Sequence, residues 1–311
     1  MKRGIACFAF CVMMASSVDI VMKLASFQSN PLQLAFWRFL LGGLACLPMA
    51  VKTIREEKLR LSLGSAGRFL VSGCVCVVLS TGLYQTAIAM GKASIVSILY
   101  CCNPLFIAAF AWWLLRERMT KGMALASVFY IGGIAVILFG WGEQTSIMSC
   151  VFTLMASALL ALYSVLGQRW IHRYPPVVYV TFSFLAGSLE LLALAGLSHL
   201  EGWAQWAQRV GLSLLVRIPV VENLTGAMIP TLVYIGVVAT GLNYLAMQVT
   251  TRELGANTMA MIFYFKLILA PLLAWLILGE RLEWSTVWSI LLIFIAIGCK
   301  MTDNLWQKRP G

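Results

Sequence analysis

The chain has 311 residues, of which 61% are hydrophobic and only 11% charged, with a mean hydropathy of +0.88. A water-soluble fold cannot bury so much apolar surface, so this composition excludes a soluble globular protein and predicts one that crosses a membrane many times. The formal net charge is +11. Its basic residues are dispersed among short loops rather than gathered on one stripe, which argues against a nucleic-acid partner and leaves the lipid bilayer as the expected surrounding.

A membrane-spanning helix needs about 20 mostly apolar residues. Apolar windows between charged or Pro/Gly-rich punctuation predict ten such helices along the chain. In chain order they cover residues 4–25, 31–51, 67–89, 94–115, 121–140, 147–170, 176–197, 228–250, 256–279 and 284–302. The chain is therefore expected to be an all-α integral membrane protein.

One connection, residues 198–227, is longer than the others. It carries Trp203, Trp206, Val210 and Leu214 near helical spacing beside polar residues. This pattern predicts an amphipathic helix that lies along the membrane surface and is anchored by its tryptophans, although a gating segment would have the same pattern.

The distribution of basic residues predicts the orientation. If both termini are cytoplasmic, sixteen of the 23 Lys and Arg residues lie on the inner side, four lie outside and three lie within spans. Loops rich in Lys and Arg stay on the cytoplasmic side of a membrane. We therefore expect a multi-pass protein of the cytoplasmic (inner) membrane with both termini in the cytoplasm.

The sequence contains an internal repeat. A shift of 163 positions aligns two stretches without a gap, and a shift of 159 aligns Thr81-Gly82-Leu83 with Thr240-Gly241-Leu242. The pairs at the first shift include Ala93 with Ala256, Ala111 with Ala274, Trp112 with Trp275, Glu117 with Glu280 and Arg118 with Arg281. Two repeats follow, at 1–142 and 143–311. Because each holds five spans, they have opposite orientations, which is typical of secondary transporters.

Several short motifs carry a family resemblance. They are Lys23, Asn30-Pro31, Arg38-Phe39-Leu40-Leu41, Asn103-Pro104-Leu105, Trp112-Trp113-Leu114-Leu115-Arg116-Glu117-Arg118 and Ala274-Trp275-Leu276-Ile277-Leu278-Gly279-Glu280-Arg281. With these motifs the chain resembles the drug/metabolite transporter superfamily in its ten-helix EamA form. The resemblance implies two inverted five-helix repeats and the transport of a small metabolite.

Five charged residues fall within the expected spans away from their ends: Asp19, Lys23, Arg38, Glu190 and Lys266. A charge near the bilayer centre costs a few kcal/mol, so such residues are candidates for a water-filled cavity or an ion pair. Asp19 lies four residues before Lys23 and can pair with it, or with Arg38 on the next helix. Such a pair can be structural or functional. As the two carboxylates, Asp19 and Glu190 are the candidates for proton coupling.

Lys266 is placed in the middle of the ninth span and aligns with Asn103 in the fourth. Pro104 is expected to kink the fourth span and free a carbonyl oxygen there. The Lys266 ammonium can bind a substrate carboxylate, be balanced by Glu190, or be permanently paired to fix the helix packing. The candidate substrate-binding residues are Lys266, Asn103, Arg38, Tyr100, Tyr264, Asn243 and Tyr84.

These features favour a secondary transporter that exports a small zwitterionic or anionic metabolite, such as an amino acid, by alternating access. The alternatives are uptake or exchange of a nucleotide-like metabolite, and a membrane protein that transports nothing. No catalytic motif of the His-Glu-x-x-His or Gly-x-Ser-x-Gly type is present, so we expect no catalytic residues, no metal and no cofactor. A homo-oligomer is compatible with the sequence.

Overall fold

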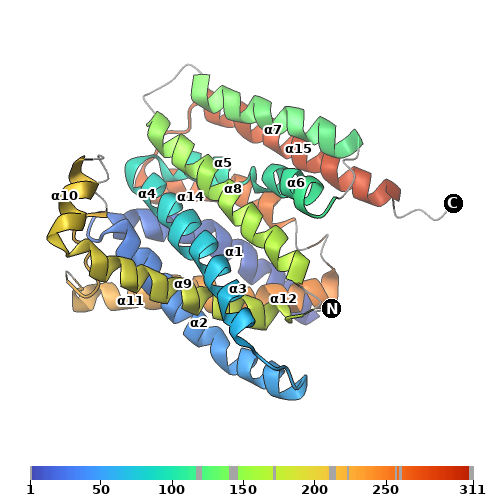
Figure 1. The fold of residues 1–311 in the computed structure, drawn as a ribbon. Coiled ribbons are helices and arrows are strands. Elements are labelled where there is room, and N and C mark those ends of the chain that lie inside the picture. The colour runs from blue at the N-terminus through green and yellow to red at the C-terminus, as the bar shows by residue number, and fades with distance from the viewer. Residues whose placement is uncertain are drawn as a thin grey trace. The chain divides into compact units, whose positions relative to one another are not determined.

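The computed structural model describes residues 2–116, 121–139, 146–170, 173–209, 215–222, 224–255, 258 and 261–307, and within them it is helical and contains no strand (Figure 1). Eight helices in the described part are long and apolar enough to cross a membrane, and two shorter apolar helices, Ile262–Leu278 and Trp284–Cys299, complete the series. The all-α membrane fold expected from the sequence is confirmed.

The first five spans are α1 (Lys2–Ser26), α2 (Pro31–Glu56), α3 (Leu63–Gly73) continued by η1 (Cys74–Thr81) and α4 (Gly82–Met90), α5 (Ala93–Tyr100) continued by α6 (Asn103–Leu114), and α7 (Lys121–Phe139). The second five are α8 (Ile147–Trp170), α9 (Pro176–Ser198), η3 (Gly226–Met228) continued by α11 (Ile229–Val233), η4 (Tyr234–Leu242) and α12 (Asn243–Leu254), α14 (Ile262–Leu278) and α15 (Trp284–Gln307). Most limits agree with the expected ones. The expected start of the ninth span at 256 lies outside the described residues.

Local sequence signals explain where individual helices begin and end. The Asn30 side chain accepts a hydrogen bond from the Leu32 amide at 2.8 Å, and Pro31 takes the first position of α2. Both are favoured at a helix N-terminus, where amides lack intrahelical partners. At its other end α2 runs to Glu56, about one turn past the expected limit, where Lys52 and Glu56 lie 3.7 Å apart on the exposed surface.

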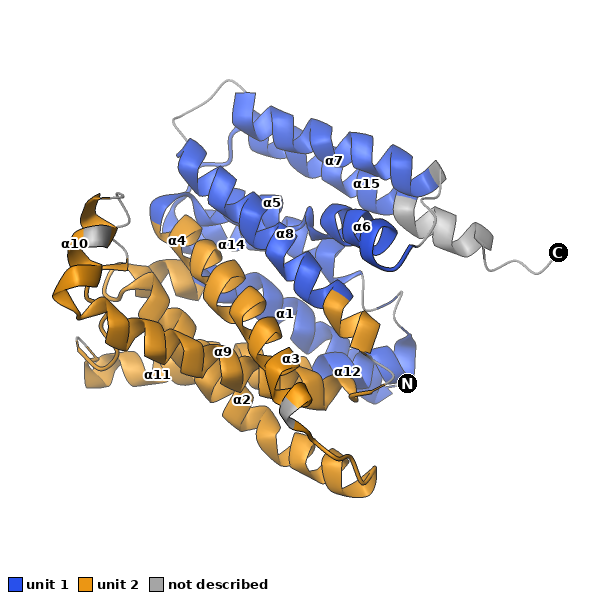
Figure 2. Ribbon diagram, in the orientation of Figure 1, with its two compact units in different colours: residues 1–20, 90–165, 246–311 blue, residues 21–89, 166–245 orange. Residues whose placement is uncertain are grey.

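The chain divides into two compact units, which Figure 2 shows in different colours. Unit 1 contains residues 1–20, 90–165 and 246–311, and unit 2 contains residues 21–89 and 166–245. Unit 2 therefore holds the second and third spans together with the seventh and the eighth as far as Leu245. Unit 1 holds the fourth and fifth together with the ninth and tenth. Each unit thus combines equivalent spans of the two expected repeats, whose boundary at 142/143 lies outside the described residues.

Aligned residues of the repeat have matching environments inside unit 1. Ala111 and Ala274 are both buried, whereas Trp112 and Trp275 are 57% and 52% exposed. Within the same unit α7 packs along α15, and α14 packs against α5. The two tryptophans are therefore both exposed, on α6 and on α14, and the inverted repeat stays a prediction.

In unit 2, α9 packs closely on α3 and η1 through glycine. A Cβ at Gly187 would lie 2.5 Å from Val77 Cβ and 2.7 Å from Gly73 O, so no side chain fits there. We expect Gly187→Ala to destabilise the protein by about 1–3 kcal/mol, because the two helices must move apart. Gly196→Ala is the matched control on the same helix, since nothing lies within 4 Å of its added Cβ.

The measurement is the apparent melting temperature of each purified variant in detergent. A lower value for Gly187→Ala than for Gly196→Ala is the expected result. Equal melting temperatures for the two variants would show that α9 can move away from α3 and η1 without loss of stability.

The long connection forms the expected amphipathic helix, α10 (Glu201–Arg209). Trp203 Nε1 donates to Leu215 O at 3.1 Å, which ties this helix to the chain that follows it. The position of α10 along the membrane surface stays a prediction. Val210, Leu214 and the side chain of Trp206 lie outside the described residues.

Candidate functional site

An ion pair lies in the core of unit 1. Lys266 Nζ on α14 is 2.9 Å from Asp19 Oδ2 on α1, and their side chains are 8% and 1% exposed. Ser97 Oγ, on α5, donates a hydrogen bond to the same carboxylate oxygen. Transfer of two charges out of water is costly, and mutual attraction and added hydrogen bonds offset the cost. The three residues therefore form a neutralised polar group that joins the first, fourth and ninth spans.

The sequence leaves three possibilities open for Lys266, and one of them is a balance with Glu190. The sequence offers Glu190 as its counter-ion, whereas the structure pairs Lys266 with Asp19. The ammonium also lies 5.3 Å from the centre of the Tyr100 ring, within the range of a cation–π contact. Unit 1 thus brings together three candidate residues from three spans: Asp19, Tyr100 and Lys266.

The fourth span is interrupted beside this pair, as expected from Pro104. Helix α5 ends at Tyr100, and α6 begins at Asn103. Proline has no amide to donate to the Tyr100 carbonyl oxygen, which instead lies 3.4 Å from Ser157 Oγ. Asn103 Nδ2 in turn donates to Ser157 O at 2.8 Å. A side chain of α8 therefore donates to the freed carbonyl oxygen, and the side-chain amide of Asn103 holds the start of α6 against the backbone of α8.

Tyr264 lies two residues before Lys266 on α14 and is half-buried. Its ring packs edge-on against Phe294 with the centroids 5.0 Å apart. This contact fixes the side chain against α15 and makes Tyr264 part of the aromatic packing of unit 1.

Unit 2 contains a second charged site, at Arg38 on α2. Arg38 Nε donates to Thr240 Oγ1 at 2.9 Å, and Nη1 lies 3.2 Å from Met22 Sδ. Both acceptors are neutral, and a thioether is a weak one. Among the described residues no carboxylate forms a salt bridge with Arg38. Because arginine stays protonated in proteins, the site keeps a positive charge.

Lys23 is held differently from Arg38. Its Nζ donates to Ile88 O at 2.9 Å and to Ala89 O at 3.1 Å, at the C-terminal end of α4. Carbonyl oxygens at a helix C-terminus carry partial negative charge and favour a cation. The Lys23 ammonium is therefore stabilised by the backbone near the end of its span.

Three further candidates belong to unit 2 with Arg38. Tyr84 is buried on α4, and Asn243 is half-buried at the first position of α12, directly after η4. Glu190, on α9, is half-buried, and its Oε2 is enclosed without a hydrogen-bond partner among the described residues. Unit 2 thus contains one candidate cation with neutral partners and one candidate carboxylate.

Sequence reasoning missed three polar residues that support these sites: Ser97, Ser157 and Thr240. Serine and threonine are common in membrane helices, where most of them bond to the backbone of their own helix. Composition therefore gave no signal for the two serines. Thr240 did carry one, because the Thr-Gly-Leu triplet recurs in both halves of the chain.

The model of the EamA-like transporter family matches residues 2–139 and 147–300. The chain belongs to the EamA-like transporter family. A relative in Clostridium kluyveri, named an uncharacterized transporter, is 29% identical to this EamA-like transporter over 96% of the chain and 92% of the relative.

A second relative, the uncharacterized transporter YdfC of Bacillus subtilis, is 26% identical over 81% of this chain and 75% of its own length. A solved crystal structure superposes with a TM-score of 0.63 at 14% identity and covers 99% of this chain and 100% of the other. This last likeness shows the fold alone. Family and relatives together identify the protein as a multi-pass membrane transporter rather than an enzyme.

Proposed function

We propose that this EamA-like transporter is a secondary carrier that exports a small zwitterionic or anionic metabolite, similar to an amino acid, by alternating access. The observation that supports an anionic group on the substrate is Arg38, whose guanidinium lies in a membrane span and has neutral partners, Thr240 and Met22. A charge within a membrane span is costly when it has no counter-charge, unless a ligand or the water of a cavity contacts it. A substrate carboxylate supplies a bidentate partner of the right geometry.

The Asp19–Lys266 pair provides the second element of the proposed mechanism. Protonation of Asp19 removes the negative charge that holds Lys266, and the ammonium can then bind a different acceptor. Ser97 donates a hydrogen bond to the Asp19 carboxylate and thereby orients it. We assign proton coupling to Asp19, with Glu190 as the second candidate in the other compact unit.

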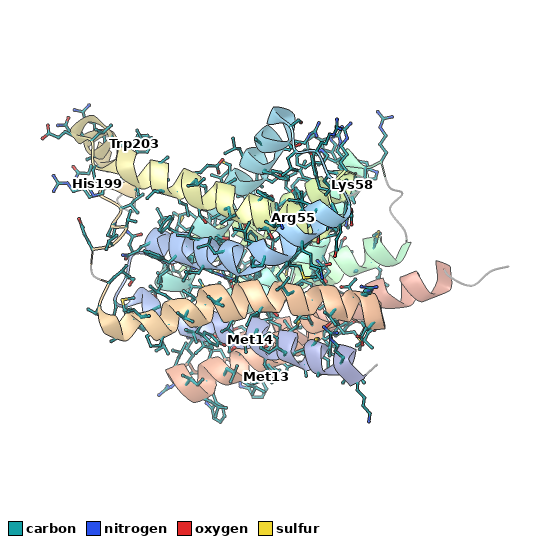
Figure 3. The ribbon with its side chains drawn as sticks, turned by 90° about the horizontal axis from the view of Figure 1, so that it is seen from below. Met13, Met14, Arg55, Lys58, His199 and Trp203 are labelled. Atoms are coloured by element: carbon teal, nitrogen blue, oxygen red, sulfur yellow. The ribbon has the colours of Figure 1, made fainter. Side chains whose placement is uncertain are left out.

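We further propose that the termini face the cytoplasm and that the protein resides in the cytoplasmic membrane. Figure 3 supports this orientation inside unit 2, where Arg55 and Lys58 lie at one end of the helices and His199 and Trp203 at the other. The basic end fits the cytoplasmic side, since Lys and Arg accumulate there, and the tryptophan of α10 fits the opposite interface.

The test is counterflow transport in liposomes that contain the purified protein. The vesicles are loaded in turn with each common amino acid, with small carboxylates and with nucleotide sugars, and uptake of the labelled compound is measured with and without a pH gradient. We expect exchange of one carboxylate-bearing class and stimulation by the gradient. Exchange restricted to nucleotide sugars would replace the proposed substrate class, and a rate independent of the gradient would remove proton coupling.

A further inference from the structure

Two spans of unit 2 contain wide π-helical turns at equivalent positions. The third span changes from α to π geometry at Cys74–Thr81, and the eighth at Tyr234–Leu242. Under the 159-residue shift that aligns the Thr-Gly-Leu triplets, residues 74–81 correspond to 233–240. Turns of this kind are rare in proteins, and those that occur are often found at functional sites. Their recurrence in both halves shows that the widened turn is a property of the repeated unit.

A threonine closes each wide turn with an unusual hydrogen bond. Thr81 Oγ1 donates to Cys76 O at 2.9 Å and Thr240 Oγ1 to Ile235 O at 2.7 Å, in both cases five residues back. In the ordinary α-helical parts the threonine hydroxyl donates four residues back, as in Thr86, Thr153 and Thr250. The longer reach follows from the widened turn, because it brings the carbonyl five residues back into position.

The two threonines differ in one respect. Thr240 Oγ1 also accepts the hydrogen bond from Arg38 Nε at 2.9 Å, whereas Thr81 has no such contact with a cation in the described part of the chain. The single hydroxyl oxygen of Thr240 therefore joins the Arg38 guanidinium to the carbonyl of Ile235. This connection breaks the symmetry between the two wide turns.

The face of α2 that carries Arg38 packs directly against η4. Arg38, Gly42 and Cys46 are four residues apart and lie along this face. A Cβ at Gly42 would lie 2.8 Å from Thr240 Cγ2, and Cys46 Sγ lies 3.4 Å from Gly241 O. With so little space between the helices, a change at η4 requires a change in its contacts with α2.

We propose that Thr240 is a positioning residue that couples the occupation of Arg38 to the shape of the eighth span; this rests on the proposed function, in which Arg38 binds the substrate carboxylate. A carboxylate that approaches the guanidinium side-on uses Nε and one Nη, so it displaces Thr240 from Nε. A charged acceptor is about twice as strong as a neutral one and therefore wins this competition. The released Thr240 no longer ties η4 to α2, and the segment is free to move.

The first experiment needs no identified substrate. Hydrogen–deuterium exchange is measured on the purified protein in lipid nanodiscs for the wild type, Arg38→Gln, Thr240→Val, Thr240→Ser and Thr81→Val. Arg38→Gln and Thr240→Val are expected to accelerate exchange of amides in 229–245 by about tenfold, the effect of one lost charge-assisted hydrogen bond. Thr240→Ser should behave as the wild type. Thr81→Val should affect only residues 70–86.

Sodium acetate is the carboxylate probe, compared with sodium chloride at equal ionic strength. It should accelerate exchange in 229–245 of the wild type and not of Arg38→Gln. Unchanged exchange in this segment for both Arg38→Gln and acetate would overturn the coupling.

The second experiment uses the substrate found by counterflow. Thr240→Val should lower turnover about tenfold and lower KM as well, because the carboxylate no longer has to displace a hydroxyl from Arg38 Nε, and Thr240→Ser should restore both values. Thr250→Val, which removes an ordinary threonine hydroxyl from the same span, is the matched control. Equal turnover for Thr240→Val and Thr250→Val would overturn the coupling and leave the proposed function intact. Absence of any carboxylate substrate would instead contradict the proposed function.

Discussion

Replacing Lys266 by methionine is expected to abolish transport and to lower the stability of the protein by about 3–5 kcal/mol, the effect of leaving one charge of a buried pair without its partner. Asp19 is fully buried, so its carboxylate has no access to water when the ammonium 2.9 Å away is removed. Asp19→Asn is expected to inactivate as well, because it removes the group that we assign to proton coupling. The measurements are counterflow transport and thermal unfolding of the purified protein.

The double variant Asp19→Leu with Lys266→Met separates a functional pair from a structural one. Apolar replacement of both members of a buried pair is often neutral or stabilising, so the double variant should regain the stability that Lys266→Met loses. Transport should stay absent. Lys92→Gln provides a control, since Lys92 forms a more exposed ion pair with Glu283 at 2.8 Å and should retain transport. Transport by the double variant would show that the Asp19–Lys266 pair only holds helices together.

The spans themselves could be predicted from the sequence because the bilayer constrains them strongly. Each crossing needs about 20 apolar residues with internally satisfied backbone groups, so hydropathy alone identifies the elements. The amphipathic helix α10 and the break at Pro104 follow from equally local rules, namely the spacing of tryptophans and the missing amide of proline. These features depend on residues that are neighbours in the sequence.

The partners of the charged residues could not be predicted in the same way. Sequence spacing shows that Asp19 and Lys23 share a helix face, but it does not show which distant span approaches Asp19 at the same depth. The structure brings Lys266 there from the ninth span. The wide turns were hidden for a related reason. Thr-Gly is compatible with an ordinary helix, and the π geometry is seen in the structure, where Thr81 and Thr240 each donate to a carbonyl five residues back.

Replacing Arg38 by glutamine is expected to raise the KM for the carboxylate substrate by about two orders of magnitude, because a charge-assisted bidentate contact is lost. Arg38→Lys keeps the charge but loses the planar fork, so it should recover only part of the affinity. Lys23→Gln is the matched control. Its ammonium is also within a span, but it binds the carbonyls of Ile88 and Ala89, and KM should change little.

A substrate analogue separates recognition by Arg38 from a general effect on folding. When the substrate carboxylate is replaced by a carboxamide, the wild type should lose about as much affinity as Arg38→Gln loses for the acid, since either change removes one side of the same contact. The two changes made together should then cost little more than one alone, because residues that contact each other are not additive. If the two losses of affinity add strictly, the substrate carboxylate does not bind Arg38. Lys266, once released from Asp19, would then be the next candidate to bind it.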